Sequence, residues 1–291
     1  MEQKTDMRIA LLIDSENISS KYMKIIMDEL NQYGKVTYKR VYGDFTCKER
    51  HGWRDLFLTF GLSPVQQYTY TKGKNATDTA MIIDAMDILY SGNVECFCLA
   101  TSDSDFTRLA VRFNEAGMFV IGAGEKKTPK AFVSVCDRFF LVDALLKNEE
   151  KAQVEERPKS VAAVKDNAKD KGKKDNKPAA GQQKPKQEEP VAPPAPVEDG
   201  EEKVTVLPIE ELVKSIKVII DNHADDDGWA YLGNVINGVY KAHPEFHPKL
   251  YDSSMRPANF MKSIKIGNRC PFEFQSRTIN SPNDSTFIKY V

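Results

Sequence analysis

The chain has 291 residues, and its 41 basic and 42 acidic side chains give a formal net charge of -1. This balance argues against a protein drawn to nucleic acid by its overall charge, although local basic patches remain compatible with it. No apolar run approaches the roughly 18 residues of a membrane span, and no signal-peptide pattern precedes Arg8, so we expect a cytoplasmic protein without a membrane partner.

The first predicted element is a short apolar strand that stops at an acid. The apolar run after Arg8 ends at Asp14, which is followed by Ser-Glu-Asn17. A short run of this kind predicts a strand buried on both faces, as in a parallel sheet. Functional groups of open α/β sheets gather where strands emerge, so Asp14 is a candidate functional residue. The alternative is that Asp14 and Asn17 only cap the helix that follows.

Helices and strands alternate through the remainder of the first 146 residues. Their periodicity predicts helices over 19–33, 53–60, 79–90, 106–116 and 131–136, and strands over 36–42, 64–68, 94–100, 119–122 and 139–142. Such alternation predicts parallel β-α-β units in a layered α/β fold. The helix over 79–90 is apolar on nearly every side, so we expect it to be packed deep.

The five cysteines have no C-x-x-C spacing, which argues against a disulfide framework and a zinc site. Cys96 and Cys98 fall within a predicted strand. We expect both to be small core residues.

Acidic side chains follow several of these elements. Asp14 follows the first strand, Asp78 opens a helix, and Asp103 and Asp105 follow the strand over 94–100. Neighbouring strands would bring these acids into one crevice, where their mutual repulsion calls for a cation. Mg²⁺ or Mn²⁺ takes oxygen ligands, bridges to phosphate oxygens and activates water. The alternative is helix capping, by Asp103 itself and by Asn75 with Asp78 in a capping box.

Three separated motifs resemble the NYN domain, a PIN-like ribonuclease family. They are Leu11-Leu-Ile-Asp14-Ser-Glu-Asn17, Lys72-Gly-Lys-Asn-Ala-Thr-Asp78 with Asp84 following, and Thr101-Ser-Asp103-Ser-Asp105-Phe106. They occur in the family's order, and the resemblance extends over residues 7–143. It implies a Rossmann-like (PIN-like) parallel sheet with a metal-binding acidic crevice that cleaves RNA.

The resemblance also implies roles for individual residues. Asp14, Asp78 and Asp103 would bind Mg²⁺ or Mn²⁺, with Asp105 as a fourth acid and Asn17 orienting metal, water or substrate. Asp84 is set apart from these residues, because a six-residue offset from Asp78 turns it away on a regular helix. The expected products carry a 5′-phosphate.

Basic and aromatic side chains offer contacts for single-stranded RNA. Lys72, Lys74, Arg40 and Arg50 are candidates for binding phosphate. Interleaved aromatic residues are candidates for stacking on bases, namely Tyr42, Phe45, Trp53, Tyr68 and Tyr70. The alternative is that most of these aromatic residues belong to the core.

Composition divides the chain into three parts. Residues 7–146 form the predicted nuclease domain, and residues 147–203 are rich in Lys, Glu, Pro and Ala, which predicts a disordered linker. Residues 204–291 have helices followed by a terminal hairpin, the order of a winged helix. The phrases Asp227-Gly-Trp229-Ala-Tyr-Leu232-Gly233 and Phe287-Ile-Lys-Tyr290 resemble the LOTUS (OST-HTH) domain, which implies binding of RNA or a protein partner.

The sequence therefore predicts a metal-dependent ribonuclease that carries an RNA- or partner-binding module. The first alternative is a non-catalytic RNA-binding or adaptor protein whose acids bind metal weakly or only cap helices. A DNA-binding regulator is the second alternative.

Overall fold

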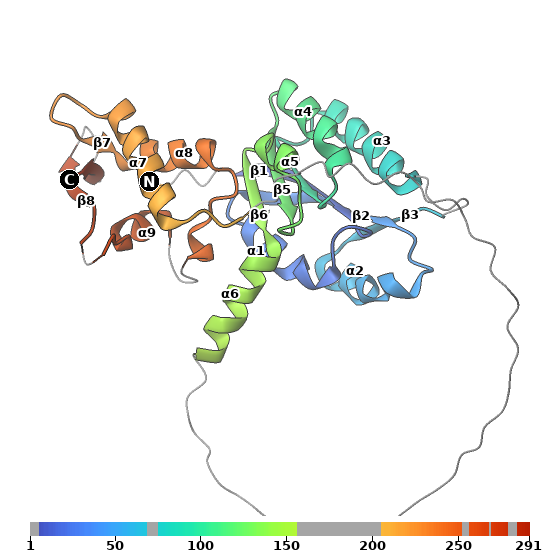
Figure 1. Cartoon of the computed structure of the whole chain (residues 1–291). Coiled ribbons are helices and arrows are strands. Elements are labelled where there is room, and N and C mark those ends of the chain that lie inside the picture. The colour runs from blue at the N-terminus through green and yellow to red at the C-terminus, as the bar shows by residue number, and fades with distance from the viewer. Residues whose placement is uncertain (1–5, 69–74, 156–204, 252–255, 268, 279–283) are drawn as a thin grey trace, which may run out of the picture.

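The computed structural model describes residues 6–68, 75–155, 205–251, 256–267, 269–278 and 284–291. An N-terminal region ends with helix α6 (Val142–Glu155), and a smaller C-terminal region begins near residue 205. The two regions lie side by side, with the C-terminal region next to strand β6 (Arg138–Leu141) of the larger one (Figure 1).

The N-terminal region is a six-stranded parallel sheet with the strand order β3-β2-β1-β4-β5-β6. The strands are β1 Met7–Asp14, β2 Gly34–Gly43, β3 Ser63–Gln66, β4 Cys96–Ala100, β5 Phe119–Gly124 and β6 Arg138–Leu141. The α-helices are α1 Met23–Leu30, α2 Arg54–Phe60, α3 Ala76–Ser91, α4 Thr107–Glu115, α5 Lys130–Ser134 and α6 Val142–Glu155. Short 3-10 turns lie at Ser20–Tyr22, Lys48–Trp53 and Ser104–Phe106. The predicted parallel α/β fold is confirmed.

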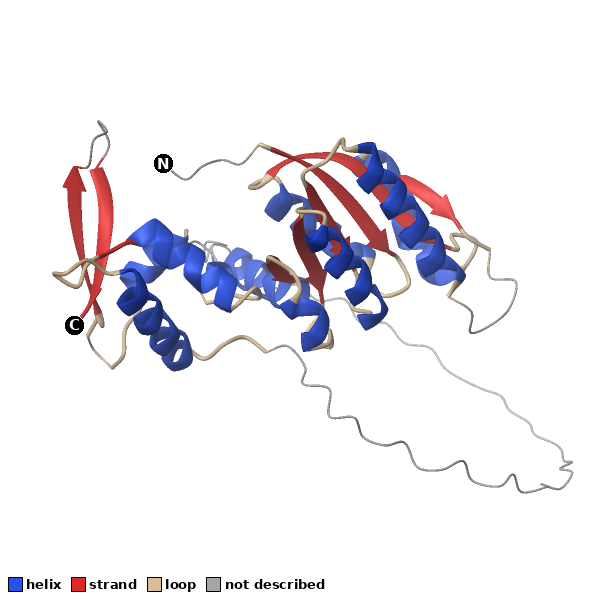
Figure 2. Cartoon of the chain, turned by 90° about the horizontal axis from the view of Figure 1, so that it is seen from above, coloured by secondary structure: helices blue, strands red, loops and turns tan. Residues whose placement is uncertain are grey.

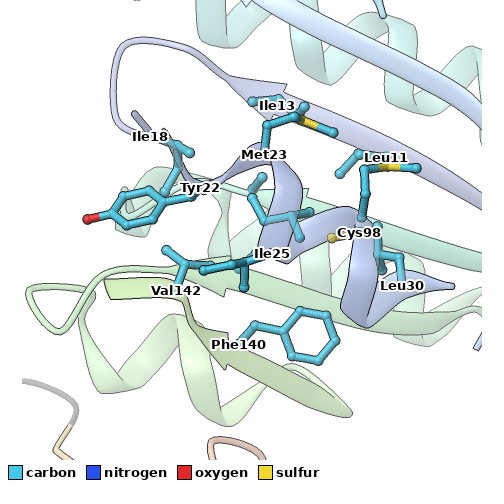
Figure 3. Close-up of a cluster of buried hydrophobic side chains, with 14 of the residues drawn as sticks. Leu11, Ile13, Ile18, Tyr22, Met23, Ile25, Leu30, Cys98, Phe140 and Val142 are labelled. Atoms are coloured by element: carbon cyan, nitrogen blue, oxygen red, sulfur yellow. The ribbon is translucent and has the colours of Figure 1, made fainter. Parts of the chain in front are cut away.

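Helices cover both faces of the sheet, α3, α4 and α5 on one face and α1, α2 and α6 on the other (Figure 1). The alternation of side chains along β1 divides the core accordingly. Leu11 and Ile13 pack toward α1 and α6, together with Met23, Phe140 and Val142 (Figure 3). Ala10 and Leu12 pack on the opposite face beneath α3 and α4. A strand apolar on both faces is therefore central to the sheet, as its sequence predicts.

Helix α3 is less deeply packed than its sequence predicts. Ile83 is 59% exposed and Tyr90 is 74% exposed, whereas Met81 and Ala85 are fully buried. The prediction of a deeply packed helix was wrong, because only one face of α3 meets the sheet and no described element covers the other. Helix α3 therefore carries apolar side chains on its exposed face as well as on its buried face.

A polar contact holds the buried face of α3 to β2. Asp84 accepts a hydrogen bond from the buried hydroxyl of Tyr42 and forms an ion pair with Arg40. Its offset from the start of α3 turns this carboxylate toward β2. Asp84 thus has a structural role that joins a helix to a strand.

The C-terminal region combines helices with a small antiparallel sheet. Its elements are α7 Ile209–His223, β7 Ala230–Tyr231, α8 Leu232–Ala242, α9 Pro257–Ser263, β8 Phe272–Thr278 and β9 Asp284–Tyr290, with a 3-10 turn at Pro248–Leu250. The sheet has the order β7-β9-β8. Figure 2 shows the β8–β9 hairpin at the end of this region that is farther from the large sheet. A separate apolar core lies between α7, α8, α9 and the hairpin. The predicted order of helices and terminal hairpin is confirmed.

The N-terminal region extends beyond its predicted boundary. Helix α6 continues through Glu155, so the expected start of the linker at residue 147 is corrected. Local composition did not reveal this because tertiary contacts support the helix: Leu145 is buried against α1, and Asn148 contacts the C-terminal region. The rest of the predicted linker, residues 156–203, lies outside the described residues.

The prediction that Cys96 and Cys98 are core residues is confirmed. The five cysteines are unpaired, and Cys96 and Cys98 are buried core residues. Among the described helices, none has the length and apolar character needed to cross a membrane.

We expect Asp84→Ala to lower the free energy of unfolding by about 1–3 kcal/mol, because the Tyr42 hydroxyl and the Arg40 guanidinium lose their partner. Urea unfolding monitored by circular dichroism measures the change. Asp87→Ala, an exposed acid on the same helix, is the matched control and should have little effect. Equal stability of the two variants would contradict the structural role of Asp84.

Candidate metal centre

The acidic residues gather where the order of the strands reverses. β1 pairs with β2 on one side and with β4 on the other, and chain connections leave these strands in opposite directions. Such a switch point opens a crevice at the carboxyl ends of the strands. Asp14 is the last residue of β1, and Asp103 follows the end of β4. Because Asp14 shares a face with Ala10 and Leu12, its side chain is on the side covered by α3.

Three carboxylates meet at this crevice. Asp78, Asp103 and Asp105 each have an oxygen within 4.8 Å of the other two, and they come from α3 and from the turn after β4. Asp78 and Asp103 are half-buried, whereas Asp105 is exposed. The structure thus brings together two of the three predicted metal ligands and Asp105, which was expected to be a fourth acid.

Burial and the closeness of these carboxylates raise the pKa of Asp78. Burial, followed by the negative charges of Asp14, Asp103, Glu16 and Asp105, raises its pKa from 3.8 to about 6. Like charges that cannot separate disfavour further ionisation, and a bound cation relieves that repulsion. The fold therefore holds a carboxylate in an environment that favours either a proton or a metal ion.

Asp14 is fully buried and well supplied with hydrogen bonds. Its Oδ1 accepts from the backbone N–H of Glu16 at 2.9 Å, and its Oδ2 accepts from Asn17 Nδ2 at 2.7 Å and Thr101 Oγ1 at 2.9 Å. Asn17 thus orients Asp14 directly. Asp14 lies outside the group of three closest carboxylates and acts on Asp78 through its charge.

Thr101 is a residue of this site that sequence reasoning missed. Its buried hydroxyl donates to Asp14 and accepts the backbone N–H of Asp103 at 3.1 Å, so it joins the ends of β1 and β4. The signal in the sequence was its place as the first residue of the third motif, two residues before Asp103. A threonine there is too ordinary to indicate a role without the pairing of the two strands.

The capping alternatives have mixed outcomes. Asp103 does cap the turn that follows, since its Oδ1 accepts from the backbone N–H of Asp105 at 2.9 Å. Asn75 makes no capping hydrogen bond with its side chain, and its Nδ2 instead donates to Asp105 Oδ2 at 3.3 Å. Capping by Asp103 leaves its second carboxylate oxygen for another ligand.

A basic side chain borders the acidic crevice on the β2 side. Arg50 pairs with Glu16 at 2.9 Å, and Glu16 also accepts a hydrogen bond from Thr77 Oγ1 at 3.2 Å. Gly43 permits this arrangement, because a Cβ at that position would lie 2.1 Å from Ser15 Oγ and 3.3 Å from Arg50 Cδ. A positive charge is thus held beside the negative cluster.

The other residues predicted to contact RNA are paired with an acid, buried in the core, exposed or outside the described residues. Arg40 is paired with Asp84, and Lys72, Lys74 and Tyr70 lie outside the described residues. Three of the predicted stacking residues, Tyr42, Phe45 and Trp53, are buried in the core, whereas Tyr68 is 54% exposed. The alternative that most of these aromatic residues are core residues is therefore correct for these three.

A second group of charged residues follows the end of β5, and no sequence motif indicated it. Glu125 is joined to the turn after β4, because its backbone N–H donates to Ser102 Oγ at 3.0 Å. The side-chain carboxylate of Glu125 accepts a hydrogen bond from Tyr22 Oη at 2.9 Å and forms an ion pair with Lys127 at 3.1 Å. Lys21 Nζ lies 4.7 Å from the centre of the Tyr22 ring. Cationic side chains thus lie on two sides of the acids.

Comparison with known proteins identifies the N-terminal region. Residues 8–143 match the NYN domain. The resemblance expected from the sequence is confirmed for this part of the chain, whereas the LOTUS resemblance of the C-terminal region stays a prediction.

Two similar proteins have no described function. An uncharacterized protein of Methanocaldococcus jannaschii is 26% identical over 127 residues, which are 42% of this chain and 50% of that protein. The chain therefore matches about half the length of this relative. A crystal structure of a protein of unknown function from Vibrio parahaemolyticus has a TM-score of 0.39 and 17% identity, covering 48% of this chain and 94% of that one.

We expect Asp78→Asn to raise the melting temperature of the metal-free protein at pH 7 by roughly 2–4 °C, because it removes a charge that the fold disfavours. The folded pKa of about 6 exceeds the ordinary 3.8, so ionisation of Asp78 lowers stability as pH rises through this interval. The gain should therefore be absent near pH 4. Thermal unfolding in EDTA measures both values, with Asp87→Asn as control. An equal gain at pH 4 and pH 7 would contradict the electrostatic cause.

Removing the Thr101 hydroxyl should destabilise the joined strand ends. We expect Thr101→Val to cost about 1–3 kcal/mol, since Asp14 loses a donor and the Asp103 N–H loses its acceptor in a buried site. Thr101→Ser retains the hydroxyl and should recover most of the loss. Urea unfolding of the three proteins provides the comparison, and a serine variant as unstable as the valine variant would argue against the hydrogen bonds.

Proposed function

We propose that the NYN domain is a divalent-metal-dependent ribonuclease that hydrolyses RNA phosphodiesters at the acidic crevice. The observation that carries this proposal is the convergence of Asp78, Asp103 and Asp105 at the switch point of the sheet. The raised pKa of Asp78 supports a site in which negative charge needs compensation. The match of residues 8–143 to the NYN domain supports the same chemistry.

The residues of the crevice fit Mg²⁺ or Mn²⁺. They supply only oxygen donors, and three of them are carboxylates close enough to share one ion. Asp78, Asp103 and Asp105 would hold it, with the charge of Asp14 adding to its attraction. When bound, such a cation offsets the carboxylate charges and stabilises the negative charge that develops on the phosphodiester.

The protein's own side chains have complementary roles in this proposal. Thr101 and Asn17 hold Asp14 in one orientation through two hydrogen bonds. Asp105 is the most exposed acid of the cluster, and we assign it the orientation of the attacking water. Preorganised groups of this kind contribute to catalysis because they need no rearrangement during the reaction.

An RNA strand suits the charges around the crevice. Arg50 lies on the β2 side of the acids, and Lys21 and Lys127 lie on the β5 side. Phosphates on either side of the scissile bond would meet these cations, which offsets their repulsion from the acids. We propose that the C-terminal region is a LOTUS-type module that binds RNA or a protein partner.

One observation favours a second function, a non-catalytic RNA-binding or adaptor protein. Asp14 already accepts hydrogen bonds on both oxygens, and Asp103 caps the following turn. Acids satisfied in this way can persist for structural reasons alone. Cleavage activity distinguishes the two functions.

We expect the purified protein to cleave an end-labelled single-stranded RNA with Mn²⁺ or Mg²⁺ and not in EDTA. Asp14→Asn and Asp103→Asn should each lower the rate by about 100-fold or more, because they remove charge that the metal and the transition state require. The products should carry a 5′-phosphate.

Asp87→Asn is the control in this assay, since it removes an exposed acid from α3 outside the crevice. Circular dichroism confirms that each variant is folded. If RNA binds but stays intact under all these conditions, the adaptor function replaces the nuclease.

A further inference from the structure

A second buried charge lies at the opposite end of the sheet from the acidic crevice. Glu29, near the end of α1, is only 1% exposed. Tyr33 follows the end of α1 in the chain, and its carbonyl accepts a hydrogen bond from the backbone N–H of Met7 at the start of β1. The C-terminal end of α1 therefore lies beside the amino ends of the strands. An eight-residue strand separates it from Asp14 by on the order of 25 Å, at about 3.3 Å per residue. Glu29 therefore belongs to a different site.

The charge of Glu29 is compensated mainly by the C-terminal region. Lys249 Nζ donates to Oε1 at 2.6 Å, and His247 Nε2 lies 2.9 Å from Oε2, which also accepts from Gln32 at 2.8 Å. His247 Nδ1 accepts the backbone N–H of Lys249, so the ring proton is on Nε2 and is donated to Glu29. Burial opposes ionisation, but His247 and Lys249 outweigh it and hold the pKa of Glu29 below its ordinary value.

The same surface also contacts the backbone of the C-terminal region. Asn148 Nδ2 on α6 donates to the carbonyls of Lys249 at 2.9 Å and Leu250 at 3.1 Å. The backbone N–H of Phe139 donates to the carbonyl of Pro244 at 2.8 Å. Phe139 lies on β6, the last strand of the sheet, so this bond covers part of an open strand edge.

Apolar contacts complete the interface. Leu250 packs against both cores of the N-terminal region. The guanidinium of Arg138 lies 3.7 Å from the centre of the Tyr240 ring, and the rings of Phe140 and His247 meet edge to face. The contact thus combines a buried ion pair, backbone recognition and apolar packing.

We propose that the surface of α1, β6 and α6 around Glu29 is a specific docking surface for residues 244–250 of the same chain. Glu29 binds the lysine and histidine side chains of this segment, and Asn148 binds its backbone carbonyls. The C-terminal region is therefore held as a fixed part of the molecule, whether or not the covalent connection through residues 156–204 is intact. This proposal does not depend on nuclease activity.

Docking at this position leaves the acidic crevice open. The docking surface lies at the amino ends of the strands, whereas Asp14 and Asp103 lie at their carboxyl ends. RNA held by the C-terminal region would approach the crevice from one fixed direction. The docked region acts as a rigid extension of the NYN domain.

Cutting the connection within the full chain tests the proposal. A site for a specific protease is inserted between residues 170 and 190, and the intact protein is purified and then cut. We expect the two fragments to remain together as a 1:1 complex at low micromolar concentration in size-exclusion chromatography and native mass spectrometry. Glu29→Gln keeps the shape but removes the charge, and it should weaken the complex by about 100-fold or more, so that the fragments separate.

Two further variants make the result specific to the ion pair. Lys249→Met removes the partner charge from the opposite side of the contact and should also release the fragments, even if Glu29→Gln fails to fold. Asp28→Asn is the matched control, because Asp28 is the neighbouring acid on α1 and pairs with the exposed Lys24. This control should leave the complex intact.

Hydrogen exchange on the uncut chain gives an independent readout. The Phe139 amide should be protected in the wild-type protein and in Asp28→Asn, and it should exchange faster in Lys249→Met. Separation of the wild-type fragments on cutting, or unchanged association in both Glu29→Gln and Lys249→Met, would overturn the proposal. A 2:2 complex would also overturn it, since the docking surface would then hold the segment of a second copy.

Discussion

The parallel pairing of β1 with β4 is the constraint on which the site depends. Each strand is apolar on both faces and must be central, and their neighbouring carboxyl ends bring Asp14 and Asp103 together. Thr101 then joins the two ends through its hydroxyl. Helix α3 adds Asp78 from above the sheet. The acidic crevice is thus a consequence of strand order, since no local segment holds more than two of its acids.

The two ends of the sheet treat buried negative charge in opposite ways. At the carboxyl ends, several acids face one another, and the pKa of Asp78 rises because the described residues around it leave negative charge in excess. At the amino ends, Glu29 is more deeply buried, yet its pKa falls because His247 and Lys249 contact it. A bound cation would stabilise the first arrangement, whereas the charge of the second is already compensated by the contacts between the two regions.

The C-terminal region covers the β6 edge of the large sheet but leaves the outer face of α3 exposed. Residues 244–250 cover the edge of β6, whereas α3 on the other half of the sheet has exposed Ile83 and Tyr90. The direction of the docked region is set by contacts with α1, β6 and α6.

The alternating elements, the parallel α/β class and the acids at strand ends could be predicted from the residues alone, because they depend on local periodicity and composition. The same holds for the direction of Asp84 on its helix, since helix geometry is local. Three features could be found only in the folded molecule: Thr101 joins the strand ends, α6 extends past residue 147, and Glu29 meets Lys249. These features rest on contacts between residues far apart in the chain, and no local pattern encodes such pairs.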